Sequence, residues 1–188
     1  EQRDRAREAA GRDDSGLDGG GWIEIAPLHG TEFVGYLHQE AEVEVCRYKG
    51  VAVEGGFEYL VITDRTPFYA ESGGQVGDIG TMCFQSKRCA QVTDTFKQHD
   101  TIIHRLFSKE EVVAADWSSP VVASVAFDQR SATKRNHSAT HLLQSALRSV
   151  LGDHIQQSGS RVDALRLRFD FTHFRALSAN EMSAVERQ

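Results

Sequence analysis

The stretch RSATKRNHSATHLLQSALRSVLG, Arg130 to Gly152, is the strongest helix signal in the chain and separates two parts of different character. Apolar residues recur along it at the three- and four-residue spacing of a helix that buries one face. Gly152 stands where a glycine commonly follows the last helical residue. We therefore expect a long amphipathic helix whose apolar face consists of Ala139, Leu142, Leu143, Ala146, Leu147, Val150 and Leu151.

The part before this helix, from Gly30 to Phe127, has β character. In AEVEVCRY, residues 41–48, valines alternate with glutamates at the two-residue period of a half-buried strand. Turns are expected at Lys49–Gly50 and Glu54–Gly56. Further strands are expected in residues 31–36, 57–64, 79–85, 90–96, 101–107 and 120–127. Several short strands with glycine-containing turns predict a small barrel or sandwich.

The part after the helix mixes strand and helix signals. Residues 154–162, HIQQSGSRV, predict a turn region, and LRLRFDF, residues 165–171, alternates as a strand. A last helix begins at Ser178, with Glu181 three residues on as the partner of a capping box. The fold class is therefore α+β.

Three domains are expected. Residues 1–29 would be a helical lead and a linker from an upstream domain, because EQRDRAREAAGR is helical in character and DDSGLDGGG breaks the helix. Residues 30–127 would be a β-barrel subdomain. Residues 128–188 would be an α/β subdomain that is cut short, so we expect both ends of the chain to lie inside a longer protein.

Composition and charge are those of an ordinary globular protein. The 188 residues are 40% hydrophobic and 26% charged, and no run approaches the length of a membrane span. The N-terminus lacks the apolar core of a signal peptide, so we expect a cytoplasmic protein with no membrane partner. The net charge is −6, but residues 1–129 carry 12 Lys and Arg against 22 Asp and Glu, while residues 130–188 carry 9 against 5. The back part is therefore basic.

The three cysteines, Cys46, Cys83 and Cys89, are expected to be reduced structural thiols. An odd number without close pairs argues against a disulfide framework. The six-residue separation of Cys83 and Cys89 is not a zinc-knuckle spacing.

Two histidines, His137 and His141, stand four residues apart in the long helix. Side chains at this spacing share a helix face, and two imidazoles can converge on one zinc. The spacing also fits a solvated polar face. A metalloprotease is excluded, because its HExxH motif needs a glutamate where Ser138 stands. On a helical wheel the pair shares a polar stripe, directed away from the apolar face, with Arg130, Lys134, Gln144 and Arg148.

Two ligands do not complete a tetrahedral zinc site. His154, His173 and the cysteines are the other candidates in the chain, and none has a spacing that recommends it. Either further ligands lie beyond Gln188 or no metal binds.

A glycine-rich stretch, TPFYAESGGQVGD, runs from Thr66 to Asp78. Its glycines permit close approach of a ligand to the backbone, but the same composition fits a β-hairpin turn. It is not a Walker loop, because the Gly-Lys-Ser/Thr ending is absent, and it is not the GxGxxG of a dinucleotide-binding fold.

Three blocks in this order and spacing resemble the editing domain of alanyl-tRNA synthetase: residues 66–80, 135–162 and 167–174, the last reading LRFDFTHF. The resemblance covers almost the whole chain. It implies hydrolysis of tRNA(Ala) mischarged with serine or glycine, in a parent enzyme that ligates alanine to tRNA(Ala) with ATP in an upstream domain. A binding pocket cannot strongly reject a smaller or hydroxylated analogue, which is why a second, hydrolytic site is needed. The implied fold is a barrel followed by a truncated editing subdomain of the threonyl/alanyl type.

The resemblance also implies residue roles. His137 and His141 would be zinc ligands, and the other two would come from a Cys-x3-His segment that is absent here and expected beyond Gln188. The zinc would activate water, polarise the ester carbonyl or hold the substrate. Gln157 and Gln75 would act at the reacting ester, and Thr66, Gly73 and Gly74 would line the acylated 3′ end. Cations expected at phosphates are Lys134, Arg148, Arg166 and Arg168.

Two alternatives stay open. One is a freestanding trans-editing deacylase, which the helical lead disfavours. The other is a non-catalytic tRNA-binding module, and with half of the ligand set missing we expect this chain alone to bind zinc weakly and to be inactive. A threonyl-tRNA synthetase editing domain is a related fold, but ESGGQVGD favours the alanyl family. The sequence does not predict an oligomeric state.

Overall fold

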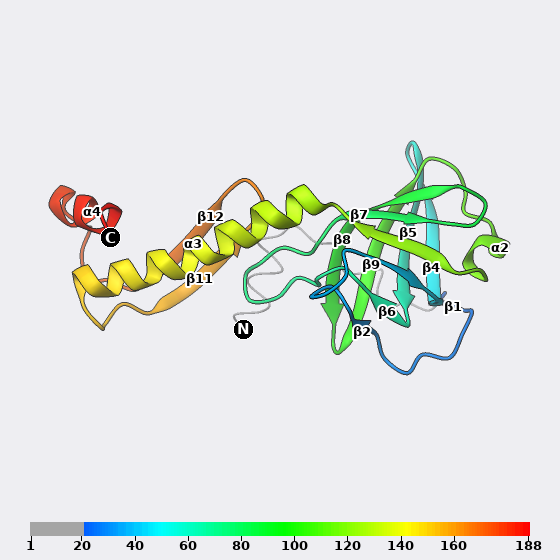
Figure 1. The fold of residues 1–188 in the computed structure, drawn as a ribbon, viewed down its shortest axis with the longest axis horizontal. Helices are drawn as coiled ribbons and strands as arrows, with labels where there is room; N and C mark the ends of the chain where they lie inside the picture. The colour runs from blue at the N-terminus through cyan, green and yellow to red at the C-terminus, as the bar shows by residue number, and fades with distance from the viewer. Residues whose placement is uncertain (1–20) are drawn as a thin grey trace.

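A curled sheet of eight antiparallel strands forms the larger part of the computed structural model, which describes residues 21–188 (Figure 1). The order across the sheet is β1-β4-β5-β9-β8-β7-β10-β3. The bounds are β1 Ile23–Glu24, β3 Glu40–Val43, β4 Val45–Val53, β5 Gly56–Thr63, β7 Gly80–Cys83, β8 Cys89–Gln98, β9 Thr101–Ser108 and β10 Val121–Val125. Beside it, β2 (Glu32–Phe33) pairs in parallel with β6 (Arg65–Thr66), and α2 (Ala114–Trp117) is a single turn.

The inner face of this sheet holds the main hydrophobic core. Trp117 is 1% exposed and stacks on Tyr48, with ring centroids 4.4 Å apart. The Tyr59 hydroxyl accepts a hydrogen bond from the Val112 backbone N–H at 2.9 Å, which fixes the segment before α2. Around these rings pack Val43, Val45, Val61, Phe68, Met82, Phe84, Ala90, Val92, Leu106, Val121, Ala123 and Val125.

The expected α+β class is confirmed, and the expected barrel appears as a curled sheet whose described strand pairing ends at β1 and β3. The run 41–48, expected to be one strand, is two: β3 and β4 are separated at Glu44, whose N–H bonds to the Asp64 carboxylate at 2.8 Å. The turn expected at Lys49–Gly50 is wrong, because both residues lie inside β4. Strand β1 falls in the stretch expected to be a linker, and the helical lead lies outside the described residues.

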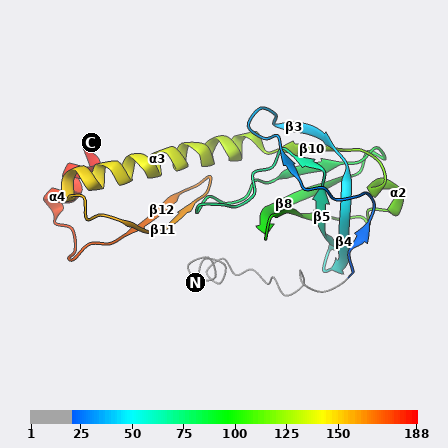
Figure 2. The ribbon, with the colours of Figure 1, turned by 90° about the horizontal axis from the view of Figure 1, so that it is seen from below.

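A second lobe projects from the sheet (Figures 1 and 2). The helix α3, Phe127–Leu151, leaves directly from β10 and runs away from the curled sheet. The hairpin of β11 (Gln157–Val162) and β12 (Leu167–Phe171) returns along it, and α4 (Ala179–Glu186) packs near its far end. Within residues 21–188, no helix is both long enough and apolar enough to cross a membrane.

The buried face of α3 shares Leu147 with the expected apolar face, whose other residues, apart from Leu142, are half-buried. Its buried residues are Thr133, Thr140 and Leu147, spaced seven apart on the side that faces the β11–β12 hairpin. Leu142, which was expected to lie in the core, is 71% exposed. Leu142 is exposed because the β11–β12 hairpin packs on one side of α3 and covers a narrower strip of the helix than a full core would.

The region expected to be a turn, residues 154–162, contains strand β11, so that expectation is wrong. Gly159 sits where a Cβ would meet the Asp170 carboxylate at 2.7 Å, so the glycine permits close strand pairing here. The capping box at α4 is confirmed: Ser178 accepts from the Glu181 N–H, and the Glu181 carboxylate accepts from the Ser178 N–H. Hydrogen bonds from Arg175 and Ser178 lower the pKa of Glu181 to about 2.

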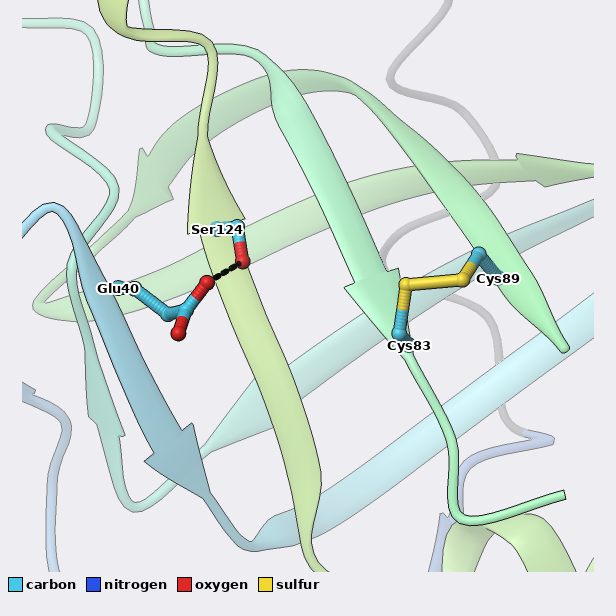
Figure 3. The surroundings of a disulfide bond; sticks show 4 residues. All are labelled: Glu40, Cys83, Cys89 and Ser124. Atoms are coloured by element: carbon cyan, nitrogen blue, oxygen red, sulfur yellow. Dashed lines mark hydrogen bonds between the residues drawn. A yellow bond between two sulfur atoms is a disulfide. The ribbon is translucent and has the colours of Figure 1, made fainter. Parts of the chain in front are cut away.

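Cys83 and Cys89 form a disulfide, which corrects the expectation of three reduced thiols (Figure 3). The two residues face each other in the β7–β8 ladder, a proximity that residue spacing alone does not reveal. Figure 3 also shows the neighbouring bond from the Ser124 hydroxyl to Glu40, 2.6 Å long, which joins β10 to β3. Cys46 is buried and free, and burial raises the pKa of its thiol.

Reduction of this disulfide is expected to lower the free energy of unfolding by about 2 kcal/mol, because it frees a short loop in the unfolded chain. Urea unfolding with and without a phosphine reductant measures the difference. A Cys83→Ser/Cys89→Ser variant serves as the control and should not respond to reductant. Titration of the denatured, unreduced chain should give one free thiol, and three free thiols would contradict the bond.

Candidate functional site

The histidine pair lies in the middle of α3, where the helix carries both rings on one side. His137 Nε2 and His141 Nε2 are 3.1 Å apart, and their ring centroids are 5.0 Å apart. His137 is half-buried and His141 is exposed. The predicted convergence of the two imidazoles is therefore present in the structure.

The glycine-rich stretch forms a tight hairpin turn. The Ser72 and Gln75 backbones exchange hydrogen bonds of 3.2 and 3.0 Å around Gly73 and Gly74. Both glycines have positive φ, +60° and +84°, as a two-residue type I′ turn requires at its central positions. This turn needs residues that tolerate left-handed backbone, which explains the paired glycines.

The tip of this loop docks on strand β11 of the second lobe. Val162 donates its N–H to the Gly74 carbonyl at 2.8 Å, and Val76 donates to the Val162 carbonyl at 3.0 Å. A Cβ on Gly74 would lie 2.5 Å from the Ser160 carbonyl oxygen, so only glycine allows this approach. On the other side, a Cβ on Gly77 would lie 1.9 Å from the Thr95 carbonyl oxygen of β8. The loop thus spans the two lobes in close contact with both.

Docking places the Gln75 side chain against the histidine pair. Gln75 is 8% exposed, and its Oε1 lies 2.6 Å from His137 Nδ1. Asn136 beside it donates from its side-chain amide to the Asp163 carbonyl at 2.8 Å, which ties α3 to the β11–β12 turn. Residues from the loop, the helix and the hairpin therefore meet at one point.

The base of the loop is anchored by a buried ion pair. Arg130, in the first turns of α3, donates from Nε to the Asp78 carboxylate at 2.9 Å and from a terminal nitrogen to the Gly35 carbonyl at 3.1 Å. Its other terminal nitrogen contacts Asp78 and the Pro67 carbonyl. The side chains of Arg130 and Asp78 are 10% and 5% exposed. Arg130 was expected on the solvated stripe, and this expectation is corrected because the loops that contain Gly35 and Pro67 cover the start of the helix.

Thr66 lies in the core of the first lobe, at the start of the glycine-rich stretch. It is fully buried, and its hydroxyl is 2.7 Å from His104 Nε2 and accepts from the Phe68 N–H at 3.1 Å. His104 Nδ1 lies 3.1 Å from the Val61 carbonyl, so Nδ1 carries the proton and Nε2 accepts from Thr66. Burial lowers the pKa of His104 to about 4. Thr66 thus holds the loop entry in place.

The spacing of His137 and His141 suits two ligands of a metal ion, but two ligands do not complete a site. Two nitrogens bound to a tetrahedral zinc at about 2.0–2.1 Å lie roughly 3.3 Å apart, close to the 3.1 Å observed. Within residues 21–188, however, no three His, Cys, Asp or Glu side chains cluster as a metal site would need.

A cavity of about 180 Å³ lies one helical turn away from the histidine pair, between the loop, Thr133 of α3 and the 163–165 turn. His154 and His173 form a separate pair, with Nε2 and Nδ1 2.8 Å apart.

Known proteins were compared with the chain as a whole. Residues 1–156 match the family model described as tRNA synthetases class II (A). The chain belongs to the class II tRNA synthetases. The mixed α+β fold with its curled antiparallel sheet is consistent with a domain of this family.

Among class II synthetases, the chain is homologous to alanine–tRNA ligases. It is 46% identical to the one from Chlorobaculum tepidum, over 100% of this chain and 22% of that protein. It is 41% identical to the Cytophaga hutchinsonii enzyme and 43% identical to that of Bacteroides fragilis, in each case over 20% of the relative. The chain spans about a fifth of the length of the curated relatives it matches. These matches do not favour a freestanding deacylase or a non-catalytic module.

The structure of this class II synthetase segment brings some of the sequence-predicted site residues together and leaves others apart. Gln75, Gly74, His137 and His141 lie in one site, and Gly73 forms the turn beside them. Gln157 is the exposed first residue of β11, five residues before Val162, and makes no side-chain hydrogen bond to the histidine pair.

The cations expected at phosphates differ in their partners. Arg148 bonds to Asp153 at 3.0 Å, Arg168 to Asp170 at 3.1 Å, and Arg166 lies 3.9 Å from Asp163. All three arginines remain substantially exposed. Lys134 is exposed and has no ion pair among the described residues. It is therefore the cation of this set with the fewest competing contacts.

Two buried residue pairs that organise the site do not follow from the sequence: Arg130 with Asp78, and His104 with Thr66. The residues of each pair lie 52 and 38 positions apart, so no local pattern joins them. The signal that could have marked them is a charged or polar residue inside an otherwise apolar run, such as His104 in TIIHRLF.

Proposed function

We propose that this chain is the editing module of an alanine–tRNA ligase, hydrolysing the ester of tRNA(Ala) mischarged with serine or glycine. tRNA(Ala) would be its partner, and the parent ligase would use ATP in another domain. The homology to alanine–tRNA ligases supports the proposed identity of the parent enzyme, and the arrangement of the site supports the proposed hydrolytic role.

The observation that carries the proposal is the meeting of the glycine-rich loop with the helix α3 and the β11–β12 hairpin around the histidine pair. The loop lies far from the helix and the hairpin in sequence, yet it joins the helix through the contact of Gln75 with His137, 62 positions away, and the hairpin through its hydrogen bonds to Val162. Structural packing alone would not require two imidazoles with facing Nε2 atoms, 3.1 Å apart, on a partly exposed helix face.

We propose zinc as the cofactor, with His137 and His141 as two of its ligands and the others from outside the described residues. Bound there, zinc would activate a water, polarise the ester carbonyl or hold the substrate amino group. The chain's own residues would orient the reactants: Gly73 and Gly74 would line the acylated 3′ end, with the open side of Gly73 toward the terminal adenosine and Gly74 fixed against β11. Lys134 and the exposed Arg148, Arg166 and Arg168 would neutralise phosphates. Gln157 would serve only if the bound 3′ end reaches the start of β11.

Substitution of His137 by alanine in a full-length ligase carrying this segment tests the proposal. We expect zinc to fall from one per chain to below a tenth, because one ligand of the pair is gone. Deacylation of Ser-tRNA(Ala) should fall roughly 100-fold, since Lewis-acid assistance is worth several kcal/mol. Alanylation of tRNA(Ala) should not change.

The matched control is His38→Ala, an exposed histidine on the other lobe, which should keep both zinc and deacylation. Full zinc content and full deacylation in the His137→Ala enzyme would sink the assignment. The 188-residue chain by itself should bind zinc weakly and turn over little, and stoichiometric zinc with turnover in this chain would contradict that expectation.

A further inference from the structure

We infer that Gln75 is a positioning residue, which holds His137 in the tautomer that turns its Nε2 lone pair toward His141. The inference rests on the proposed function in one respect, that His137 uses Nε2 as a ligand. It changes the expected role of Gln75 from a group acting on the ester to one acting through His137.

The contact at His137 Nδ1 decides which ring nitrogen of His137 carries the proton. An amide oxygen only accepts hydrogen bonds, so an Oε1 that lies 2.6 Å from Nδ1 requires a proton on Nδ1. In a neutral imidazole the other nitrogen is then unprotonated. His137 Nε2 therefore presents a lone pair toward His141, the side on which a metal would sit. A carbonyl partner on the far ring nitrogen is the usual arrangement of metal-binding histidines.

The loop fixes the amide that makes this contact. Gln75 follows the two-glycine turn, and its backbone bonds back to Ser72. The flanking bonds to Val162 hold the strand direction, so that the Gln75 side chain points to α3. With 8% of Gln75 exposed, water has little access to replace the amide. The glycine-rich loop would thus fix the orientation of the proposed zinc ligand His137 as well as line the substrate site.

The contact between the two rings decides the tautomer of His141 in the metal-free protein. Its Nε2 lies 3.1 Å from the unprotonated Nε2 of His137, so His141 donates from Nε2. Metal binding would need only His141 to move its proton to Nδ1, while His137 is already in the required form. Gln75 thus prepares one ligand of the pair in advance.

The experiment uses the metal-free, ¹⁵N-labelled 188-residue chain at pH 8, above the ordinary pKa of histidine. Long-range ¹H–¹⁵N spectra should show His137 protonated at Nδ1 and His141 at Nε2. In Gln75→Leu, His137 should lose this preference, whereas Gln75→Glu, whose carboxylate also accepts, should keep it. Zinc added to each variant should bind about 10–100-fold more weakly in Gln75→Leu than in the unchanged chain.

The matched control is Gln91→Leu on the exposed side of β8, which should leave tautomers and zinc affinity unchanged. A His137 protonated at Nε2 in the unchanged chain, or a His137 tautomer that Gln75→Leu does not alter in a folded protein, overturns the inference. If the tautomers are as expected but the chain and the full-length ligase bind no zinc, the positioning role stands and the proposed zinc chemistry fails. If zinc binds measurably, equal affinity in Gln75→Leu and the unchanged chain also overturns the inference.

Discussion

Replacing Arg130 with methionine is expected to lower the free energy of unfolding by about 3–5 kcal/mol, because it leaves the Asp78 carboxylate buried without its cation. The Asp78 side chain is 5% exposed, and within residues 21–188 the Tyr69 N–H, at 2.6 Å, is the donor that would remain on the same oxygen. The substitution also releases the carbonyls of Gly35 and Pro67 from the start of α3. Urea unfolding followed by far-ultraviolet circular dichroism gives the change.

Arg148→Met is the matched control for this prediction. It also removes an arginine of α3 from an arginine–aspartate pair, but Arg148 and Asp153 are 49% and 94% exposed, and such pairs contribute at most about 1 kcal/mol. Adding Asp78→Asn to Arg130→Met should recover part of the loss, because the uncompensated charge is removed. Equal, small effects of Arg130→Met and Arg148→Met would refute the anchoring role.

Lowering the pH from 7 to 4 is expected to remove roughly 3 kcal/mol of stability through His104 alone. Burial lowers its pKa from 6.5 to about 4 in the folded chain, so the unfolded chain takes up the proton first as pH falls. The contribution of His104 is therefore fully present above pH 6.5 and is lost progressively down to about pH 4. Each unit of pKa difference corresponds to about 1.4 kcal/mol.

His104→Gln isolates this contribution. Glutamine cannot titrate, yet it can bond to both the Thr66 hydroxyl and the Val61 carbonyl, so the variant should lose less stability between pH 7 and 4.5 than the unchanged chain. His29→Gln, at an exposed histidine, should leave the pH dependence as it was. If His104→Gln and the unchanged chain lose the same stability over this range, His104 is not buried in neutral form.

Local patterns predicted the strands and helices well where one face is buried. The alternation in FEYLVITD and TIIHRLF corresponds to β5 and β9, and the helix expected over 130–152 is α3, Phe127–Leu151. The errors fall where long-range pairing overrides local preference. Gly50 stays in β4 because β5 pairs with it, and β11 forms from a Gly/Ser-rich run because β12 supplies its partner.

Only those features of the site that depend on residues close together in the sequence were predictable. The four-residue spacing of His137 and His141 indicated a shared helix face, and the structure has both rings there. The contact of Gln75 with His137 spans 62 positions, and the cysteine pairing depends on the β7–β8 register. Neither follows from composition or periodicity, because each is set by how separate segments pack.

Because α3 is long, a change in the angle between the two lobes would displace the histidine pair less than the far end of the helix. At 1.5 Å per residue, His137 lies about 10 Å from Arg130 along the axis, and Leu151 lies about 32 Å from it. If Arg130 acts as a fulcrum, a tilt of about 5° would shift the histidine pair by roughly 1 Å but the far end of the helix by roughly 3 Å. Such a tilt would therefore leave the geometry of the histidine pair nearly unchanged. It would displace the first residues of β11 and α4, which lie near the far end of α3, much more.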